Sequence, residues 1–262
     1  MPPAQLFIVG TGRSGTQSIA YALSAEPGVR IAHEWEPRLL FELLEFREGR
    51  MKRKEMISLL KRTRAPEVIG GERLSGCANQ RLSFVIPELR EAFPDAYILG
   101  VIRDGRKVVP SLHQRGWYAE NEDDLRGPSL WPWTRSRIQG RWPGWEKASA
   151  FEKCCWYWAY TNECIQAEAA GWAADMMMTL DDVPRQLPQW LGYVVKVPCA
   201  PKFEVLNQSK DPPMPYSGAG RRRTPSRGGA HRSWIGGSRS GEANNLPLHR
   251  STCIAKSVDS DR

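Results

Sequence analysis

The sequence of 262 residues lacks the features that mark several classes of protein. No apolar run approaches the roughly 20 residues that a membrane-spanning helix needs, and residues 1–10 lack the basic, apolar and cleavage regions of a secretory signal. The six cysteines form no Cys-x-x-Cys pair, and the four histidines show no spacing typical of metal ligands. We therefore expect a cytoplasmic protein with reduced thiols, without a metal site and without a membrane partner.

The composition excludes a wholly disordered chain, because 41% of the residues are hydrophobic and 25% are charged. Lys and Arg number 37 against 29 Asp and Glu, which gives a net charge of +8. A basic excess of this size suits a nucleic acid, an anionic membrane or a small anionic ligand. The total does not separate these partners, so the position of the charge along the chain has to decide.

The basic charge is concentrated in residues 211–262, which hold eight Arg and one Lys against three Asp and one Glu. Arg, Gly, Ser and Pro make up more than half of this segment, and no apolar periodicity is present. We therefore predict a folded domain over residues 1–210 and a disordered basic tail over residues 211–262. The domain keeps only +3 of the net +8, which disfavours nucleic acid as its partner. The tail can be an arm for an acidic polymer, a linker without a role, or a divergent or out-of-frame ending.

Short apolar segments alternate with helical patterns throughout residues 1–210. The periodicity of hydrophobic residues and the local composition predict strands over residues 6–9, 29–32, 68–69, 96–102 and 175–180. They predict a helix that opens at residues 14–16 and further helices over residues 37–46, 52–62, 83–93, 106–114, 151–170 and 182–191. This alternation is typical of an α/β fold, in which helices cover both faces of a parallel β-sheet.

A glycine-rich loop follows the first predicted strand. Its sequence, GTGRSGT, runs from Gly10 to Thr16 and leads directly into a predicted helix. Backbone N–H groups and the positive end of the helix dipole bind anions at such a junction. The loop therefore predicts a phosphate site.

Three other interpretations of this loop stay open on its sequence alone. A nucleoside-triphosphate loop has a lysine and a hydroxyl where this chain has Thr16 and Gln17. A dinucleotide fingerprint fits the three glycines, but a lone acidic residue should end the next strand, and residues 33–36 read HEWE instead. The third is a glycine turn without any ligand.

A second candidate anion site follows the predicted strand over residues 96–102. Arg103 stands at its carboxyl end, and Ser111 lies eight residues later on the next predicted helix. A guanidinium and a hydroxyl placed in this way can bind one further anion. Two anion sites at two strand ends suit a nucleoside that is phosphorylated at both ends.

Both segments resemble the nucleotide-binding elements of the sulfotransferase superfamily, of the bacterial and carbohydrate type. FIVGTGRSGT at residues 7–16 resembles the loop that binds the 5′-phosphosulfate of 3′-phosphoadenosine 5′-phosphosulfate (PAPS). Residues 102–111 resemble the element that binds its 3′-phosphate. Shorter matches at residues 91–96, 114–118, 180–182 and 207–209 extend the resemblance over about residues 5–210. It implies a P-loop-like, nucleotide-binding sulfotransferase fold.

The resemblance implies an enzyme that transfers the sulfuryl group of PAPS to a hydroxyl or amine of a carbohydrate or small metabolite. PAPS is then the co-substrate, and no metal takes part. The resemblance assigns Arg13 to the bridging oxygen and the 5′-phosphate, and Arg103 with Ser111 to the 3′-phosphate. The other residues that it places around the 5′-phosphate are Gly12, Ser14, Gly15, Thr16 and Gln17.

The reaction also needs a base for the acceptor, which in this family is a His or Glu after the second strand or near the next one. Glu34 is the first candidate, His33 the second and Glu36 the third. The alternative is that they are surface residues leading into the helix predicted from residue 37. We expect Asp104 to orient Arg103 or to cap the following helix rather than to take part in the chemistry.

Six tryptophans lie within residues 131–158, beside several arginines. Trp156 and Trp158 follow a helical pattern, so we expect them in the core. The other four suit either contact with a sugar or aromatic acceptor or packing in the core. These four are Trp131, Trp133, Trp142 and Trp145.

A second hypothesis for the whole chain is a catalytically impaired PAPS-binding protein whose basic tail binds an acidic partner. The nature of the acceptor and the oligomeric state stay open on the sequence.

Overall fold

The computed structural model describes residues 3–34, 39–47, 49–62, 72–118, 144, 147–169 and 176–203. All of them belong to the first of the two units into which the chain divides, Met1–Asp211. Several predictions fall outside the described residues and stay predictions. They concern the strand over residues 68–69, the candidate base Glu36, the match at residues 207–209, the tail, and the four tryptophans Trp131, Trp133, Trp142 and Trp145.

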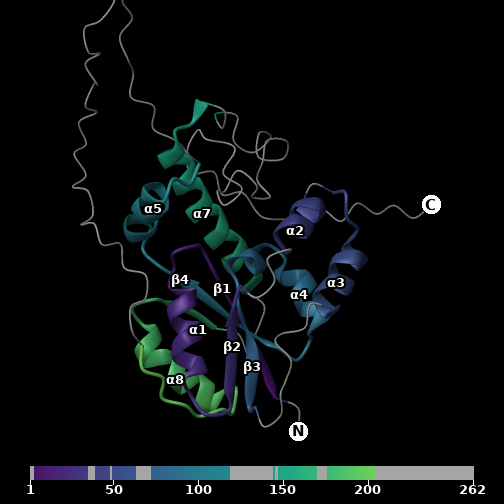
Figure 1. Cartoon of the computed structure of the whole chain (residues 1–262), viewed down its shortest axis with the longest axis vertical. Helices are drawn as coiled ribbons and strands as arrows, with labels where there is room; N and C mark the ends of the chain where they lie inside the picture. Colours follow the sequence, from purple (N-terminus) through teal and green to yellow (C-terminus); the bar gives the residue numbers. More distant parts are fainter. Residues whose placement is uncertain are drawn as a thin grey trace, which may run out of the picture. The chain divides into compact units, whose positions relative to one another are not determined.

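A five-stranded, all-parallel sheet forms the centre of this unit (Figure 1). Its order is β2-β3-β1-β4-β5, with each neighbouring pair parallel. The predicted α/β class is therefore confirmed. The strands are β1 (Ala4–Gly10), β2 (Val29–His33), β3 (Leu74–Ala78), β4 (Tyr97–Ile102) and β5 (Met176–Thr179).

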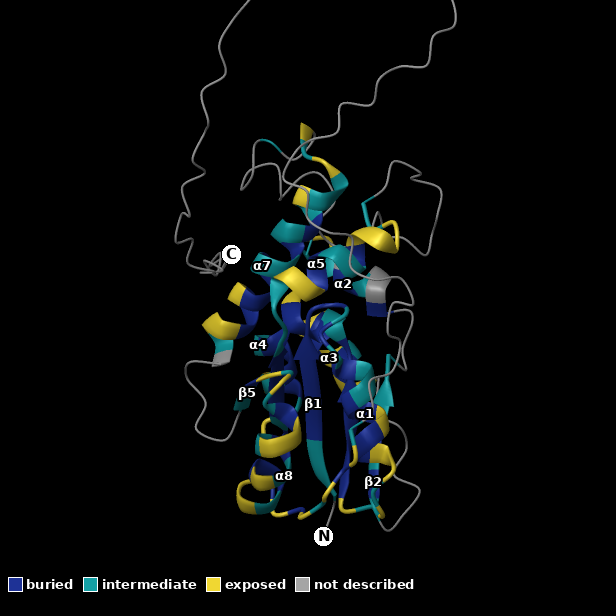
Figure 2. Cartoon of the chain, turned by 90° about the vertical axis from the view of Figure 1, so that its left-hand side faces the viewer, coloured by how far each residue is buried: buried dark blue, intermediate teal, exposed yellow. Residues whose placement is uncertain are grey.

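Helices cover both faces of the sheet. Alternate residues of β1 point to opposite faces and so belong to two separate cores. Leu6 and Ile8 pack in one core with two helices, and Phe7 and Val9 pack in a second core with four further helices. Figure 2 shows β1 buried along most of its length between these layers. The first core contains α1 (Thr16–Ser24) and α8 (Val183–Tyr193), and the second contains residues of α2 (Leu39–Arg47), α3 (Arg53–Arg62), α4 (Ile86–Ala92) and α7 (Ala150–Ala169).

Two predictions of secondary structure need correction. No strand was predicted over β3, because its sequence LSGCA has no β-branched residue and all five positions are buried between β2 and β1. The single helix predicted over residues 83–93 was wrong. A 3₁₀ helix, η1 (Gln80–Phe84), comes first, Val85 leaves the helical conformation at a φ of −136°, and α4 then begins with Pro87 in its first turn.

We expect Gly76→Ala to destabilise the fold, because a Cβ on Gly76 would overlap the carbonyl oxygen of Leu6 in the neighbouring strand β1. The backbones of β1 and β3 cannot move apart without breaking the hydrogen bonds between them, so the free energy of unfolding should fall by about 3 kcal/mol. Urea unfolding followed by circular dichroism measures this change.

Gly192→Ala is the matched control, since no atom lies within 4 Å of a Cβ at that position in α8. Its stability should stay within about 1 kcal/mol of the wild type. Equal losses for the two variants would contradict the close approach of β3 to β1.

Candidate functional site at the carboxyl edge of the sheet

The carboxyl ends of all five strands lie at one edge of the sheet. β1 ends at Gly10, β4 at Ile102 and β2 at His33, and the register aligns Gly10 with Val101 and His33 with Ala78. The predicted site residues follow these strand ends directly. Open parallel sheets bind their ligands at this edge, so the topology brings the two predicted anion elements and the candidate bases together.

The loop after β1 is held in a tight, fixed turn. The Ser83 hydroxyl accepts a hydrogen bond from the N–H of Gly10 at 3.1 Å and donates one to the Gly10 carbonyl at 3.0 Å. Arg13 and Gly15 have left-handed backbones, with φ of 68° and 96°, and α1 begins at the next residue, Thr16. Gly15 must lack a side chain, because a Cβ there would lie 2.6 Å from Cδ1 of Leu180.

Two hydroxyls of this loop are buried and lack a hydrogen-bond partner among the described residues. Thr11 and Ser14 are both 0% exposed, and among the described residues neither Oγ1 of Thr11 nor Oγ of Ser14 has a hydrogen-bond partner. Leaving a buried hydroxyl unpaired costs about 1–3 kcal/mol, so an acceptor bound in the loop would relieve that cost. Both residues belong to the loop that leads into α1, and a negative charge at the N-terminus of this helix is also favoured by the helix dipole.

Gly12 differs from its neighbours because its amide is used within the protein. Its N–H donates to the hydroxyl oxygen of Tyr157 at 3.0 Å, which differs from its predicted use as a phosphate donor. A Cβ on Gly12 would overlap Oε1 of Gln80 and lie 2.9 Å from the ring of Trp117. Gly12 therefore makes room for two side chains that pack onto the loop.

The residues predicted for the two ends of the nucleotide contact one another. Nη1 of Arg103 donates to the carbonyl of Arg13 at 2.9 Å, and Nε of Arg13 donates to Oγ of Ser111 at 3.0 Å. The carbonyl of Arg103 in turn accepts from Nε1 of Trp158 at 2.9 Å. Tertiary structure thus joins residues from the β1 loop, β4, α5 (Gly105–Gln114) and α7.

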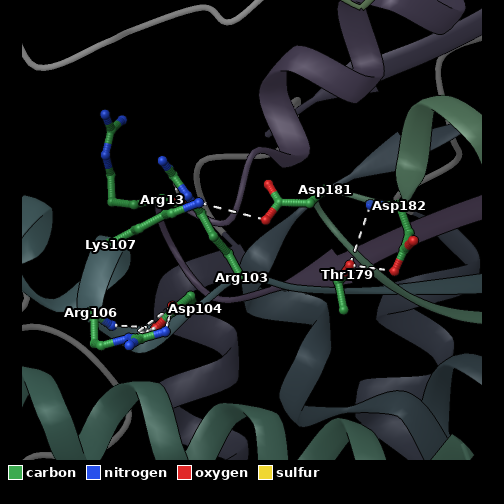
Figure 3. Close-up of polar contacts among 8 residues, drawn as sticks. All are labelled: Arg13, Arg103, Asp104, Arg106, Lys107, Thr179, Asp181 and Asp182. Atoms are coloured by element: carbon green, nitrogen blue, oxygen red, sulfur yellow. Dashed lines mark hydrogen bonds and ion pairs between the residues drawn. The ribbon is translucent and has the colours of Figure 1, made fainter.

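Positive charge is crowded at this point. Burial lowers the pKa of Arg13, and the positive charges of Arg115 and then Arg103 lower it further. In Figure 3 the side chain of Lys107 extends toward the same region, with its Nζ 3.5 Å from a carboxylate oxygen of Asp181. Cations that destabilise each other's charge in this way favour the arrival of an anion.

Asp104 caps α5 and pairs with Arg106, not with Arg103. Its Oδ1 accepts from the backbone N–H of Arg106 at 2.9 Å, and its carboxylate also accepts from the Arg106 guanidinium. These hydrogen bonds, led by the one from the side chain, lower the pKa of Asp104 to about 2. The predicted capping role is confirmed.

The two described candidate bases end β2. Glu34 has a left-handed φ of 47°, its N–H donates to the carbonyl of Ala78 at 3.0 Å, and its Oε1 accepts from Nε2 of Gln80 at 2.8 Å. Burial lowers the pKa of His33 from 6.5, with the charge of Glu34 acting against this and that of Arg81 adding to it. The lowered pKa favours the neutral imidazole, which is the form that can accept a proton.

Several residues that shape the site had no signal in the sequence. Gln80 follows the strand that was not predicted, and Ser83 and Tyr157 reach the glycine loop from elements far away in the sequence. The prediction of a core position for the two α7 tryptophans holds in part, since both are half-buried. Trp158 covers Gly105 and binds Arg103, while Trp156 stacks on Tyr160 with ring centroids 4.8 Å apart.

In the described ranges, no helix has the length and apolar character needed to cross a membrane. Within the same ranges, no three side chains of His, Cys, Asp or Glu gather closely enough to hold a metal ion.

Neither a protein-family model nor a curated protein matches this chain. Three solved structures that match the fold are sulfotransferases. The one from Alicyclobacillus acidocaldarius is 16% identical, with a TM-score of 0.45 over 79% of this chain and 87% of its own. The sulfotransferase domain from the curacin biosynthetic pathway is 13% identical, with a TM-score of 0.42 over 76% of this chain and 75% of its own. A sulfotransferase from Mycobacterium avium is 15% identical, with a TM-score of 0.41 over 76% of this chain and 65% of its own.

We predict a pH-dependent effect of Asp104→Ala on stability. The folded state holds the pKa of Asp104 below its ordinary value of 3.8, so its contribution is complete above that value and is lost as the pH falls toward about 2. Wild type should therefore melt above the variant at pH 7, and the difference should close between about pH 4 and pH 2.

Thermal unfolding by circular dichroism across this pH range measures the difference. Asp104→Asn is the control, because asparagine caps a helix equally well but does not titrate. A difference between wild type and Asp104→Ala that stays constant with pH would contradict the role of the Asp104 charge.

Proposed function

We propose that this chain is a PAPS-dependent sulfotransferase that acts on a hydroxyl or amine of a carbohydrate or small metabolite. One observation carries the proposal. The glycine loop and the Arg103–Ser111 element, which lie about 90 residues apart in the chain, meet through hydrogen bonds at the carboxyl edge of the sheet. We further propose that residues 1–210 form the transferase domain.

The residues present fit a nucleotide with phosphate groups at both ends. The unsatisfied hydroxyls of Thr11 and Ser14, the N-terminus of α1 and the guanidinium of Arg13 would hold the 5′-phosphosulfate. Arg103 and Ser111 would hold the 3′-phosphate, where a planar guanidinium can bind two oxygens at once. ATP has no 3′-phosphate to satisfy this second group, and Thr16 replaces the lysine of a triphosphate loop.

When bound, PAPS supplies the activated sulfuryl group, with a phosphate as its leaving group. Sulfuryl transfer resembles phosphoryl transfer in needing placed charges rather than covalent help from the protein. Negative charge grows on the leaving oxygen, and Arg13 with the first turn of α1 would stabilise it. Glu34 would take the proton of the acceptor group, with neutral His33 as the second candidate.

The nucleotide assignment is tested by calorimetry. We expect 3′-phosphoadenosine 5′-phosphate to bind at least about tenfold more tightly than 5′-AMP or ATP, which corresponds to about 1.4 kcal/mol. Arg103→Ala should remove most of this preference while changing the affinity for adenosine 5′-phosphosulfate by less than about threefold.

Arg62→Ala, at the exposed end of α3, removes the same charge and should leave both affinities unchanged. Equal losses for the two nucleotides in Arg103→Ala would contradict its assignment to the 3′-phosphate. Equal affinity of the wild type for all three nucleotides would overturn the nucleotide half of the proposal.

The role of Glu34 is tested by sulfate transfer. Glu34→Gln should lower transfer from radiolabelled PAPS to a panel of sugars and phenols by about 10²- to 10⁴-fold, because the amide cannot accept the acceptor proton. The affinity for 3′-phosphoadenosine 5′-phosphate should stay within about threefold of wild type.

Glu163→Gln, on the exposed face of α7, is the control and should keep full activity. If Glu34→Gln keeps its rate and His33→Gln loses it, the base is His33. Wild-type protein that binds the bisphosphate but transfers no sulfate to any acceptor would be a nucleotide-binding protein and not an enzyme.

A further inference from the structure

A chain of three hydrogen bonds connects Glu34 to the glycine loop. Nε2 of Gln80 donates to Oε1 of Glu34 at 2.8 Å, and the hydroxyl of Tyr157 donates to Oε1 of Gln80 at 3.3 Å. The N–H of Gly12 donates to the same hydroxyl oxygen at 3.0 Å. The four residues come from the end of β2, the start of η1, the middle of α7 and the loop after β1. The chain therefore runs from the end of the outer strand β2 to the loop after the central strand β1.

The chemistry of the four groups allows one direction only. A carboxylate oxygen accepts hydrogen bonds, so the amide of Gln80 presents its NH₂ group to Glu34 and its oxygen to Tyr157. The oxygen of Tyr157 already accepts the N–H of Gly12, so its own proton is directed to Gln80. Rotating the amide by 180° would place its oxygen against the carboxylate of Glu34 and break that contact.

Packing keeps the central members of the chain in place. Tyr157 is 0% exposed, and its ring lies against Trp117 with centroids 5.3 Å apart. Burial raises the pKa of its hydroxyl well above the ordinary range, so Tyr157 remains a proton donor. The amide oxygen of Gln80 occupies the space that a side chain on Gly12 would need. Asn79 fixes the start of η1, since its Oδ1 accepts from the N–H of Arg81 at 2.9 Å.

We propose that Gln80 is a positioning residue for Glu34, and that Tyr157 couples this position to Gly12 in the nucleotide loop. The proposal rests on the proposed function in one respect, the use of Glu34 as the base. As a consequence, Glu34 and the glycine loop that would hold the leaving phosphate keep a fixed position relative to each other. An anion that binds beside Gly12 would then change the environment of Glu34 through the side chains of Tyr157 and Gln80.

The coupling is tested without activity by NMR of protein labelled with ¹⁵N in its glutamine side chains. The side-chain amide signals of Gln80 are assigned by their loss in Gln80→Met. We expect Glu34→Ala and Tyr157→Phe each to shift these signals and to speed their exchange with water, because each removes one partner. Gln189→Met, the same substitution at an exposed site of α8, should leave them in place.

Addition of 3′-phosphoadenosine 5′-phosphate should shift the Gln80 signals in wild type and much less in Tyr157→Phe. Gln80 signals that respond neither to Glu34→Ala nor to Tyr157→Phe would overturn the proposal, whatever the activity of the protein. If the bisphosphate does not bind, the proposed function fails, and the responses to the two substitutions still decide on the hydrogen-bond chain.

Kinetics test the positioning role. Gln80→Met should lower kcat about tenfold to a hundredfold while changing the KM for PAPS less than about threefold, since a misplaced base costs rate and not binding. In a Glu34→Gln background the same change should have no further effect on kcat. An additive loss in the double variant would point to a general structural role and would contradict positioning.

Thermal unfolding checks that each variant is folded. Tyr157→Phe keeps the buried ring and removes only the hydroxyl, so it tests the chain even if Gln80→Met does not fold. We expect a smaller loss of kcat for Tyr157→Phe than for Gln80→Met, because the contact between Gln80 and Glu34 survives. An unchanged kcat in both folded variants would overturn the proposal.

Discussion

The parallel pairing of β1 with β3 on one side and β4 on the other is the constraint on which the site depends. This register aligns the carboxyl ends of the strands, so that the loop after Gly10 and the residue after Ile102 start from the same edge. Burial of the last five residues of β1 by helices on both faces leaves this edge as the place where polar side chains can gather. Without that alignment Arg13 and Arg103 would not meet.

The helix α7 organises the site from one side of the sheet. Tyr157 binds the backbone of Gly12, and the neighbouring residue Trp158 binds the backbone of Arg103. One turn of a single helix thus holds both anion elements, while η1 contributes Ser83 and Gln80 to the same loop. Because these contacts are made to backbone groups, they fix the two loops that carry Arg13 and Arg103.

Much of the fold and part of the site could be predicted from the sequence. The glycine loop, Arg103 and Ser111 stand in local patterns, and the apolar run of β4 is long enough to indicate a buried strand. Strand β3 could not be predicted, since LSGCA is a strand only because β1 and β2 bury it on both sides. The amide of Gly12 looked available for an anion, and only the packing of α7 shows that Tyr157 takes it.

The sequence by itself determined the α/β class and singled out the two candidate anion elements, because these depend on short-range signals: hydrophobic periodicity, glycines at a strand end, and a fixed Arg–Ser spacing. The tertiary structure decided how these parts meet. The contact of Arg13 with Ser111 and the link from Glu34 to Gly12 join residues tens of positions apart. Such contacts depend on strand register and on the rotation of α7 about its axis, which no local pattern encodes.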